Sequence, residues 1–561
     1  MVKMRLYRLA FVPMLVAVVA IMFSLEGAPA ALEPATPPAT FDGKRAANQA
    51  RQIVALAPER PPGSSGDEAV ADLVLDRFSE IAAGSVTEQE FEAGYEGVDV
   101  SLRNVLLTLP GDPASTIVVL AGRDSAHGPG AASSAAATGI LLELANALGL
   151  AGHEKTFVLA STSGTAAGAA GSRELLEGLP ERDSVEGVIV ISQPGATEPR
   201  PPYVVTSSSG RSSGPVRLAR TAELAVATQA QASGERPSPF TQLARLAIPS
   251  GLGDQAPLIA DRLDAVAISS AGERPLAEAD DTPEQLSTAS IDAFGRATQS
   301  TVDAIDTAGP ADQLPNPRLE LSDNLIPGWT LALLALTLIL PAAVAAVDAC
   351  ARAVRGGSDL TASLAWSMAR GLPFLGALLA LYGLALVGAL PRPPFPFDPG
   401  RYELGGRAAL VLSLILAAGI ATAVLLRRRG VTASAAPEAT IVGLGLVSAL
   451  ACSLLWLANP YLALLAAPLA HVWLLAARPP GALRAVAAIT LGALACLPVI
   501  AALVAVASVL ELGPDAPWTL TIMVADGQVT MLTMLASCFL AGGALGAVAL
   551  CLRRTRLPAE D

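Results

Sequence analysis

The chain has few histidines, few charged residues and no cysteine in its first half. Only His127, His153 and His471 occur among 561 residues, which limits any site that needs several imidazole ligands. All five cysteines lie at or beyond Cys350, so the first half contains no disulfide framework. The net charge of −13 argues against a nucleic-acid partner, which would require a basic face.

Charge and hydrophobicity are distributed unevenly along the chain. Charged residues make up 16% of the sequence, against about 25% in ordinary soluble proteins, and 52% of the residues are hydrophobic. Acidic and basic residues mostly precede residue 325, whereas the long apolar runs follow it. This division predicts a soluble domain followed by a membrane domain.

The first 26 residues have the composition of an export signal. Lys3, Arg5 and Arg8 precede an apolar stretch over 9–23. Ala28-Pro29-Ala30 resembles a small-residue cleavage site, but the apolar stretch is also close to the lower limit of about 17 residues for a span. The sequence is therefore compatible with a removable signal peptide and with a retained signal-anchor helix. Residues 27–40 are predicted to be a linker.

Residues 41–308 alternate between helical and strand patterns. Helical spacing occurs over 44–56, 67–81, 139–148, 218–230 and 287–305, and short apolar or β-branched runs occur over 102–109, 116–121, 156–160 and 188–191. Alternation of this kind is typical of an α/β domain. We expect a mostly parallel sheet with helices on both faces.

The second half of the chain is predicted to be an all-α polytopic membrane bundle. A proline-rich connector, 309–327, precedes seven apolar runs within 328–552: 329–349, 371–391, 407–426, 439–458, 460–477, 485–510 and 528–551. Arginine clusters lie in alternate loops and in the tail, 553–561: Arg352, Arg355 and Arg370, then 427–429, then Arg478 and Arg484, then Arg553, Arg554 and Arg556.

These arginines orient the bundle in the cell membrane, with the lipid bilayer as its partner. The positive-inside rule places both termini in the cytoplasm and residues 41–327 outside. The loop 392–406 would then carry Arg392 and Arg401 on the outer side, partly offset by Asp398 and Glu403.

Five short phrases occur in order within about 45–308: Arg60-Pro61-Pro62-Gly63-Ser64; Asn104-Val105 with Leu109-Pro110-Gly111; 121–125 with Gly130-Ala131 and 141–145; Gly168, Gly171 and Ser172; and Asp281-Thr282-Pro283-Glu284. Together they resemble the di-zinc aminopeptidase family, which includes aminopeptidase Y and glutamate carboxypeptidase II. The resemblance implies an α/β exopeptidase-like fold. The fusion to many spans is similar to membrane metallopeptidases and to the scaffold subunit of the glycolipid-anchor transamidase.

The resemblance also implies that the metal chemistry is lost. In the family, five side chains hold two zinc ions and a glutamate acts as general base. The matching positions carry poor ligands or none: Gly122, Ser133, Ala166, Ser192 and Gln255 for the ligands, and Thr165 for the glutamate. Asp124 persists, although it has no histidine to orient. We therefore expect no cofactor.

Alternative sites can be weighed residue by residue. A rebuilt zinc site would have to use Asp124, His127 and Asp254, and zinc normally needs three or more good ligands. The phrase Gly210-Arg211-Ser212-Ser213-Gly214 matches a serine nucleophile motif, but the only later histidine, His471, lies in an apolar run. His153, beside Glu154, is predicted to be a surface residue.

We predict a membrane-anchored pseudo-peptidase. Its cleft, formed by Asp124, Ser133, Ser134, Thr165, Ser192 and Gln255, would bind a peptide end or a protein partner without cutting it. One alternative is an active metallo-aminopeptidase that uses zinc with non-standard ligands. The other is a transporter or lipid-handling protein with a regulatory exterior domain, for which His471 and Asp526 are the ionisable candidates.

Overall fold

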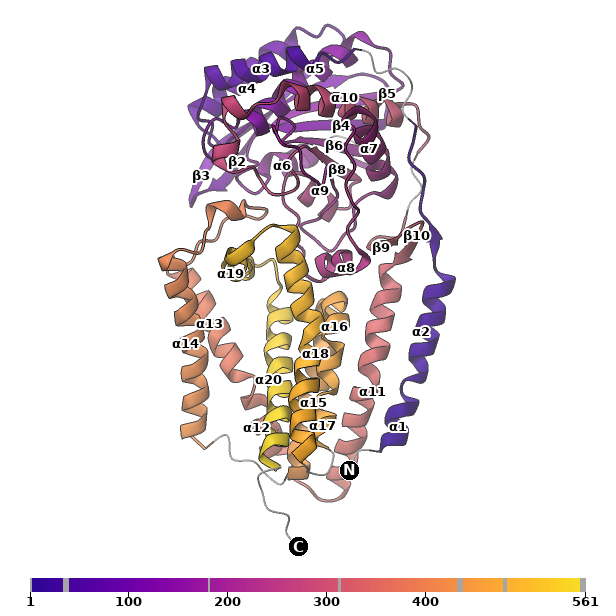
Figure 1. Ribbon diagram of the computed structural model, residues 1–561, viewed down its shortest axis with the longest axis vertical. Helices are drawn as coiled ribbons and strands as arrows, with labels where there is room; N and C mark the ends of the chain where they lie inside the picture. Colours follow the sequence, from indigo (N-terminus) through magenta and orange to yellow (C-terminus); the bar gives the residue numbers. More distant parts are fainter. Residues whose placement is uncertain are drawn as a thin grey trace.

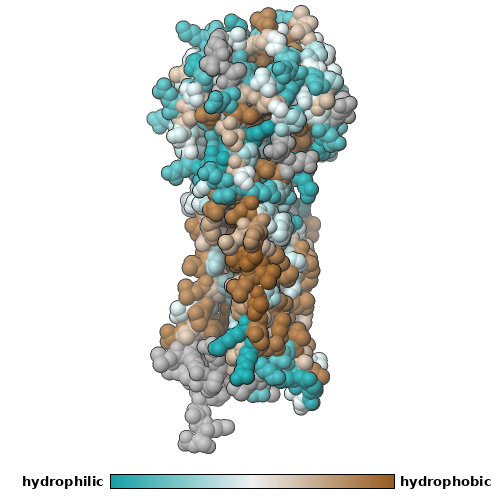
Figure 2. All heavy atoms as spheres, turned by 90° about the vertical axis from the view of Figure 1, so that its right-hand side faces the viewer, coloured by the Kyte–Doolittle hydropathy of each residue, from teal (hydrophilic) through white to brown (hydrophobic). Residues whose placement is uncertain are grey.

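The computed structural model describes residues 3–33, 40–179, 182–310, 314–430, 437–477 and 482–554. An α/β domain lies at one end of a set of long helices (Figure 1). The N-terminal end of the described chain lies at the opposite end of those helices (Figure 1). Figure 2 shows hydrophilic side chains over the α/β domain and a hydrophobic column beneath it. The predicted division of the chain into an α/β part and a helical part is therefore observed.

The α/β domain is built on a seven-stranded mixed sheet in the order β2-β3-β5-β4-β6-β8-β7. The strands are β2 (Ser85–Tyr95), β3 (Val98–Leu109), β4 (Asp112–Gly122), β5 (Lys155–Thr162), β6 (Val185–Ser192), β7 (Val204–Val205) and β8 (Ala265–Ser269). The pairs β4–β5, β4–β6 and β6–β8 are parallel, and the other three are antiparallel.

The prediction of a mostly parallel sheet is therefore wrong, because half of the strand pairs are antiparallel. The prediction omitted β2, β7 and β8. β2 was missed because it is half exposed and rich in glutamate, so it lacks the apolar run of a buried strand. Its hairpin with β3 and the short edge strand β7 supply two of the three antiparallel pairings.

Helices cover both faces of the sheet, because each central strand is apolar on both sides. Ile117 and Val119 pack with α3 (Gly43–Leu56), α4 (Ser65–Ser79), α5 (Ala136–Leu150), α7 (Val216–Gln229) and α10 (Thr288–Asp306). Val118 and Leu120 pack on the opposite face with α6 (Ala170–Glu177) and α9 (Gln255–Ala260) (Figure 1). This alternation follows the two-residue period of a strand.

Seven helices within the described ranges are long and apolar enough to cross a membrane: Met4–Phe23, Ala131–Leu150, Gly328–Arg355, Gly406–Arg428, Glu438–Ala458, Val486–Val509 and Met531–Leu552. Ala131–Leu150 is 89% buried and belongs to the α/β core, so its apolarity reflects packing against the sheet. Met4–Phe23 comprises α1 (Met4–Leu9) and α2 (Val12–Phe23).

The remaining five match predicted spans. They lie in α11 (Gly328–Arg355), α14 (Gly406–Arg428), α15 (Pro437–Ala458), α18 (Ala482–Val509) and α20 (Met531–Arg554). The predicted span 371–391 corresponds to a pair bent by 46°, α12 (Thr361–Ala369) and α13 (Leu372–Leu386). The predicted span 460–477 is the shorter helical segment Pro460–Ala476, which includes α16 (Pro460–Ala466) and α17 (Trp473–Ala476).

A small sheet joins the two parts of the molecule. Within the predicted connector, β9 (Arg318–Leu321) and β10 (Asn324–Pro327) form a hairpin that the proline pattern did not predict. β1 (Glu26–Gly27), at the start of the predicted linker, pairs antiparallel with β10 and completes the small sheet. Residues 34–39 of that linker, 311–313 of the connector, Arg478 and 555–561 of the predicted tail lie outside the described ranges.

Candidate functional site

The candidate crevice lies at one edge of the sheet, where four parallel strands end together. β4, β5, β6 and β8 end at Gly122, Thr162, Ser192 and Ser269. In an open α/β sheet, ligands bind outside the carboxyl ends of the strands. Of the positions that the sequence analysis assigned to the cleft, all but Gln255 lie on one of these strand ends or on a segment that follows one, and Gln255 begins α9 (Gln255–Ala260), just before β8.

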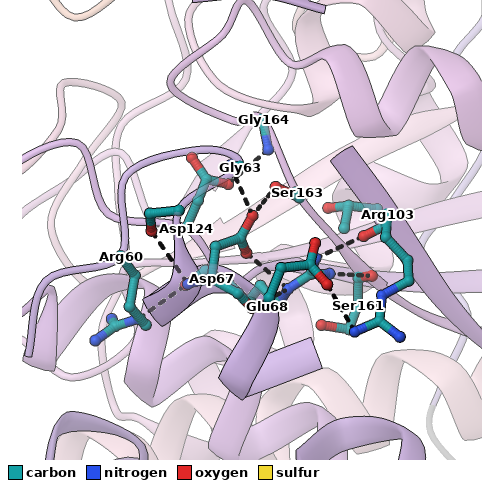
Figure 3. A network of polar contacts seen from close by, with 12 residues as sticks. Arg60, Gly63, Asp67, Glu68, Arg103, Asp124, Ser161, Ser163 and Gly164 are labelled. Atoms are coloured by element: carbon teal, nitrogen blue, oxygen red, sulfur yellow. Dashed lines mark hydrogen bonds and ion pairs between the residues drawn. The ribbon is translucent and has the colours of Figure 1, made fainter. Parts of the chain in front are cut away.

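Asp124 holds the turn between β5 and α6. Its Oδ1 accepts a backbone hydrogen bond from Gly164 at 2.9 Å (Figure 3). Oδ1 also accepts one from Thr165 at 3.0 Å, and Oδ2 accepts one from Ala166 at 3.0 Å. The side chain is buried, and burial, followed by the nearby charge of Asp67, raises its pKa to about 6. Both carboxylate oxygens therefore serve the backbone.

A second cluster fills the space around Gly122. Asp254 accepts a hydrogen bond from Thr165 Oγ1 at 2.8 Å and another from Ser172 Oγ at 2.7 Å. Burial raises the pKa of Asp254. A Cβ atom at Gly122 would lie 2.1 Å from Thr165 Oγ1, so no larger residue fits there unless Thr165 turns away from Asp254.

A third cluster ties Ser133 and Ser134 to residues that the sequence analysis did not assign to the cleft. Asp281 Oδ1 accepts hydrogen bonds from the backbone amides of Ala132 and Ser133 at 2.7 and 2.9 Å, and Ser133 Oγ donates to its Oδ2. Arg60, which is fully buried, donates from Nη2 to Ser134 Oγ at 2.9 Å. Burial lowers the pKa of Arg60 to about 10.

The two remaining cleft positions make separate contacts. Gln255 donates to the carbonyl oxygen of Leu252, and its Nε2 lies 3.5 Å from Ser207 Oγ. Ser192 is the last residue of β6 and pairs in register with Ser269. The structure therefore joins Asp124, Thr165 and Asp254 closely, while Gln255 and Ser192 border the crevice.

A buried ion pair beneath the crevice was missed by the sequence analysis. Asp67 Oδ1 lies 2.8 Å from Arg123 Nε, and neither side chain is exposed to solvent. Asp67 Oδ2 also accepts hydrogen bonds from the Gly63 amide and from Ser163 Oγ (Figure 3). The position of Arg123 directly after an apolar strand was the available signal, because a charged residue there needs a partner.

The comparisons with known proteins give a family match for part of the chain. Residues 104–302 match the family description "Peptidase family M28". This stretch of the chain is a peptidase M28 domain. The match supports the peptidase-like family indicated by the five phrases, whereas the narrower aminopeptidase Y group stays a prediction. No curated protein matches the chain.

Solved structures similar to the M28 domain include two enzyme types. The glutaminyl cyclase of an Acidobacteriales bacterium has 20% identity and a TM-score of 0.40, covering 51% of this chain and 100% of its own. A leucine aminopeptidase precursor from Bacteroides thetaiotaomicron has 16% identity and a TM-score of 0.37, covering 49% and 99%. The LapA aminopeptidase of Legionella pneumophila has 11% identity and a TM-score of 0.39, covering 48% and 72%.

The side chains of the M28 domain do not fit a zinc site. Within the described part of the chain, no group of three or more histidine, cysteine, aspartate or glutamate side chains is arranged to hold a metal ion. The oxygens of Asp124 and Asp254 already accept hydrogen bonds from their neighbours. His127 is exposed on its loop, and His153 Nδ1 lies 3.1 Å from the carbonyl oxygen of Lys155.

The serine motif and the membrane candidates have other partners. Ser212 Oγ, at the nucleophile position of the motif, donates to the carbonyl oxygen of Ala260 at 3.3 Å, and Ser213 Oγ donates to that of Arg318 at 2.7 Å. His471 lies in the helical part, where its two ring nitrogens contact Tyr7 Oη at 3.0 Å and the carbonyl oxygen of Leu338 at 2.9 Å. Asp526 ends α19 (Ala516–Asp526), which lies beneath the M28 domain rather than within a long span (Figure 1). These positions do not assemble a serine–histidine pair.

Proposed function

We propose that this protein is a membrane-anchored M28 pseudo-peptidase that binds or scaffolds a partner outside the cytoplasmic membrane. The observation that carries the proposal is the filled space at Gly122, where the Thr165–Asp254 hydrogen bond lies in the volume that a larger ligand residue would need. Catalytic zinc requires at least three protein ligands and an open coordination position. A crevice stabilised by hydrogen bonds between its own side chains is suited to binding rather than to hydrolysis.

The same clusters explain how the fold persists without metal. In a metal site, zinc would tie the segments that follow β4, β5 and β6 together. Here Asp124 ties the β4 end to the turn after β5, and Asp281 ties the segment before α5 to the loop after β8. Hydrogen bonds therefore connect the segments that zinc would otherwise connect. The hydroxyl groups of Ser133 and Ser134 give the crevice a polar lining. That lining is compatible with a peptide end or a protein partner.

Metal content and peptidase activity test this proposal directly. We expect the full-length chain, purified in detergent, loaded with zinc and dialysed, to hold no stoichiometric zinc by elemental analysis. It should also release no amino acid from aminopeptidase substrates. The active-enzyme alternative would instead give about one or two zinc ions per chain, bound at one catalytic site. In that event, zinc should be lost from the Asp124→Ala and Asp254→Ala variants but retained in a Glu223→Ala control.

We also propose that the first helix is retained as a signal-anchor. Directly after it, β1 pairs with β10, and the Ala28 amide donates to the carbonyl oxygen of Asp323 at 2.9 Å. Within the helix, Tyr7 contacts His471. Cleavage after Ala30 would remove an edge strand of the joining sheet together with a helix packed on α11.

Intact-mass spectrometry of the full chain, tagged at its C-terminus and purified from membranes, tests this retention. We expect one species that keeps the helix Met4–Phe23 and the strand Glu26–Gly27. A mature chain that begins at Ala31 would contradict the proposal. An Ala30→Leu variant serves as the matched control, because it blocks a small-residue cleavage site and should leave the mass otherwise unchanged if the helix is retained.

A further inference from the structure

The loop between α13 and α14 contains a proline-rich segment that is unusually buried for an outer connection. Residues 391–402, here called the strap, have the sequence PRPPFPFDPGRY. Phe395 and Phe397 are 4% and 6% exposed, although they lie in a loop between two apolar helices. We propose that the strap covers the mouth of the M28 crevice as an intramolecular cover, held by the segments that surround it. This inference concerns the crevice alone and holds whether or not the crevice binds zinc.

One end of the strap contacts the turn that follows β5. A Cβ atom at Gly168 would lie 2.9 Å from Pro394 Cβ and 3.1 Å from its carbonyl oxygen, so the backbone of the M28 domain approaches the strap closely there. Gly168 has φ +73°, a conformation that glycine adopts without strain. Arg173, on α6, donates from Nη2 to the carbonyl oxygen of Phe395. This turn is the one held by Asp124.

The other end contacts the turn of the β2–β3 hairpin. Arg401 Nη2 lies 3.3 Å from Tyr95 Oη and forms an ion pair with Glu96. The guanidinium carbon lies 5.5 Å from the centre of the Tyr95 ring, within the range of a cation–π interaction. In Figure 1 the segment that leads from α13 into α14 lies beneath β2 and β3.

Between these ends the strap contacts the loop that follows β8. Asp398 is partly buried, and desolvation raises its pKa, while the positive charges of Arg274 and Arg401 lower it. A Cβ atom at Gly400 would lie 3.3 Å from Arg274 Nη2. Arg274 follows β8, so the strap also meets a loop at the carboxyl edge of the sheet. Ligands of open α/β sheets bind at this edge.

The composition of the strap fits this role. Five of its twelve residues are proline, which restricts the backbone before docking and so lowers the entropy cost of binding. Phe395 packs edge-on against Phe397 at 5.8 Å, and Phe397 against Tyr402 at 5.5 Å. Phe395 and Phe397 also belong to an apolar cluster with Leu381 of α13, so the strap is fixed to the helical part as well.

The consequence is that crevice access and helix position are linked. The strap is held between α13 and α14, and only 6% of the apolar window of α14 is buried within the protein. A peptide or protein ligand that enters the crevice must displace the strap and thereby move this helical pair. Movement of the pair would conversely open the crevice.

Trypsin provides a direct test, because the strap contains two arginines of different susceptibility. Arg392 precedes Pro393 and is resistant, whereas the bond between Arg401 and Tyr402 is cleavable once it is released. In the full-length chain, the Glu96→Ala/Arg173→Ala double variant removes two anchors of the strap. We expect a new N-terminus at Tyr402 to form about tenfold faster than in the unmodified chain, because cleavage follows the undocked population.

The matched control is Glu223→Ala/Arg236→Ala, which breaks an ion pair elsewhere in the M28 domain. It should leave the rate of cleavage at Arg401 unchanged. Equal rates in all three chains would overturn the proposal. A cross-linking measurement tests the proposal even if the double variant misfolds. In a chain whose native cysteines are replaced by alanine, a short bismaleimide should cross-link the Glu96→Cys/Arg401→Cys pair. The same reagent should not cross-link the Glu96→Cys/Arg407→Cys pair. Failure of the first pair, or equal reaction of both, would also overturn it.

Discussion

Replacing Arg123 with methionine is expected to destabilise the M28 domain by about 3–5 kcal/mol, because it leaves a fully buried carboxylate without its cation. Arg123 pairs with Asp67 at 2.8 Å and also donates to the carbonyl oxygens of Ser161 and Arg103 at 3.2 and 2.6 Å. Asp67 would keep its hydrogen bonds to Gly63 and Ser163, which only partly compensate for a charge in a dry site. Pulse proteolysis of the full-length chain in urea measures the change.

Two further chains separate the charge effect from the loss of packing. The double variant Asp67→Leu/Arg123→Met removes both charges and should recover much of the loss, since a buried ion pair is often replaceable by apolar residues. Arg236→Met removes an exposed partner of Glu223, with side chains 43% and 36% accessible, and should cost less than about 1 kcal/mol. A similar small cost for Arg123→Met would show that the pair does not support the fold.

Much of the architecture could be predicted from the sequence, because periodicity reports burial directly. The four predicted strands and the five predicted helices of the α/β part correspond to observed elements, with ends that shift by a few residues. β2 escaped prediction because one face of it is exposed and carries glutamates. The β9–β10 hairpin escaped because its strands are only four residues long and lie in a proline-rich stretch. The pairing of β1 with β10 escaped because the two strands are far apart in the sequence, and such pairing leaves no local pattern.

The candidate site was predicted in position but not in its contacts. The resemblance assigned Gly122 and Thr165 to the old metal site and left Asp254 as a weak metal candidate, and the structure brings these three residues together. The sequence could not show that Asp281 contacts Ser133 from 148 residues away, since only the folded sheet brings these segments together. For the same reason the sequence alone predicts an outer loop at the strap and makes Asp526 a candidate membrane residue.

The pH dependence of stability provides the other large expected effect. The pKa of Asp124 is raised from 3.8 to about 6, chiefly by burial. The folded state therefore binds this proton more tightly than the unfolded state does. Its contribution to stability is fully present below about pH 4 and is lost as pH rises to about 6, beyond which it stays constant. The difference between the two pKa values corresponds to about 3 kcal/mol.

Asp124→Asn isolates this contribution, because asparagine resembles the protonated acid in shape and does not titrate. The free energy of unfolding of the variant minus that of the unmodified chain should increase by up to about 3 kcal/mol as the pH rises from 4 to 7. Urea unfolding followed by pulse proteolysis, with pepsin at the lower pH and thermolysin at the higher, measures both chains. Asp254 and Asp281, whose pKa values are also raised by burial, remain in both chains, so most of their effect cancels. A difference between the chains that does not change with pH would mean that Asp124 is ionised throughout and that its three backbone hydrogen bonds outweigh the cost of burial.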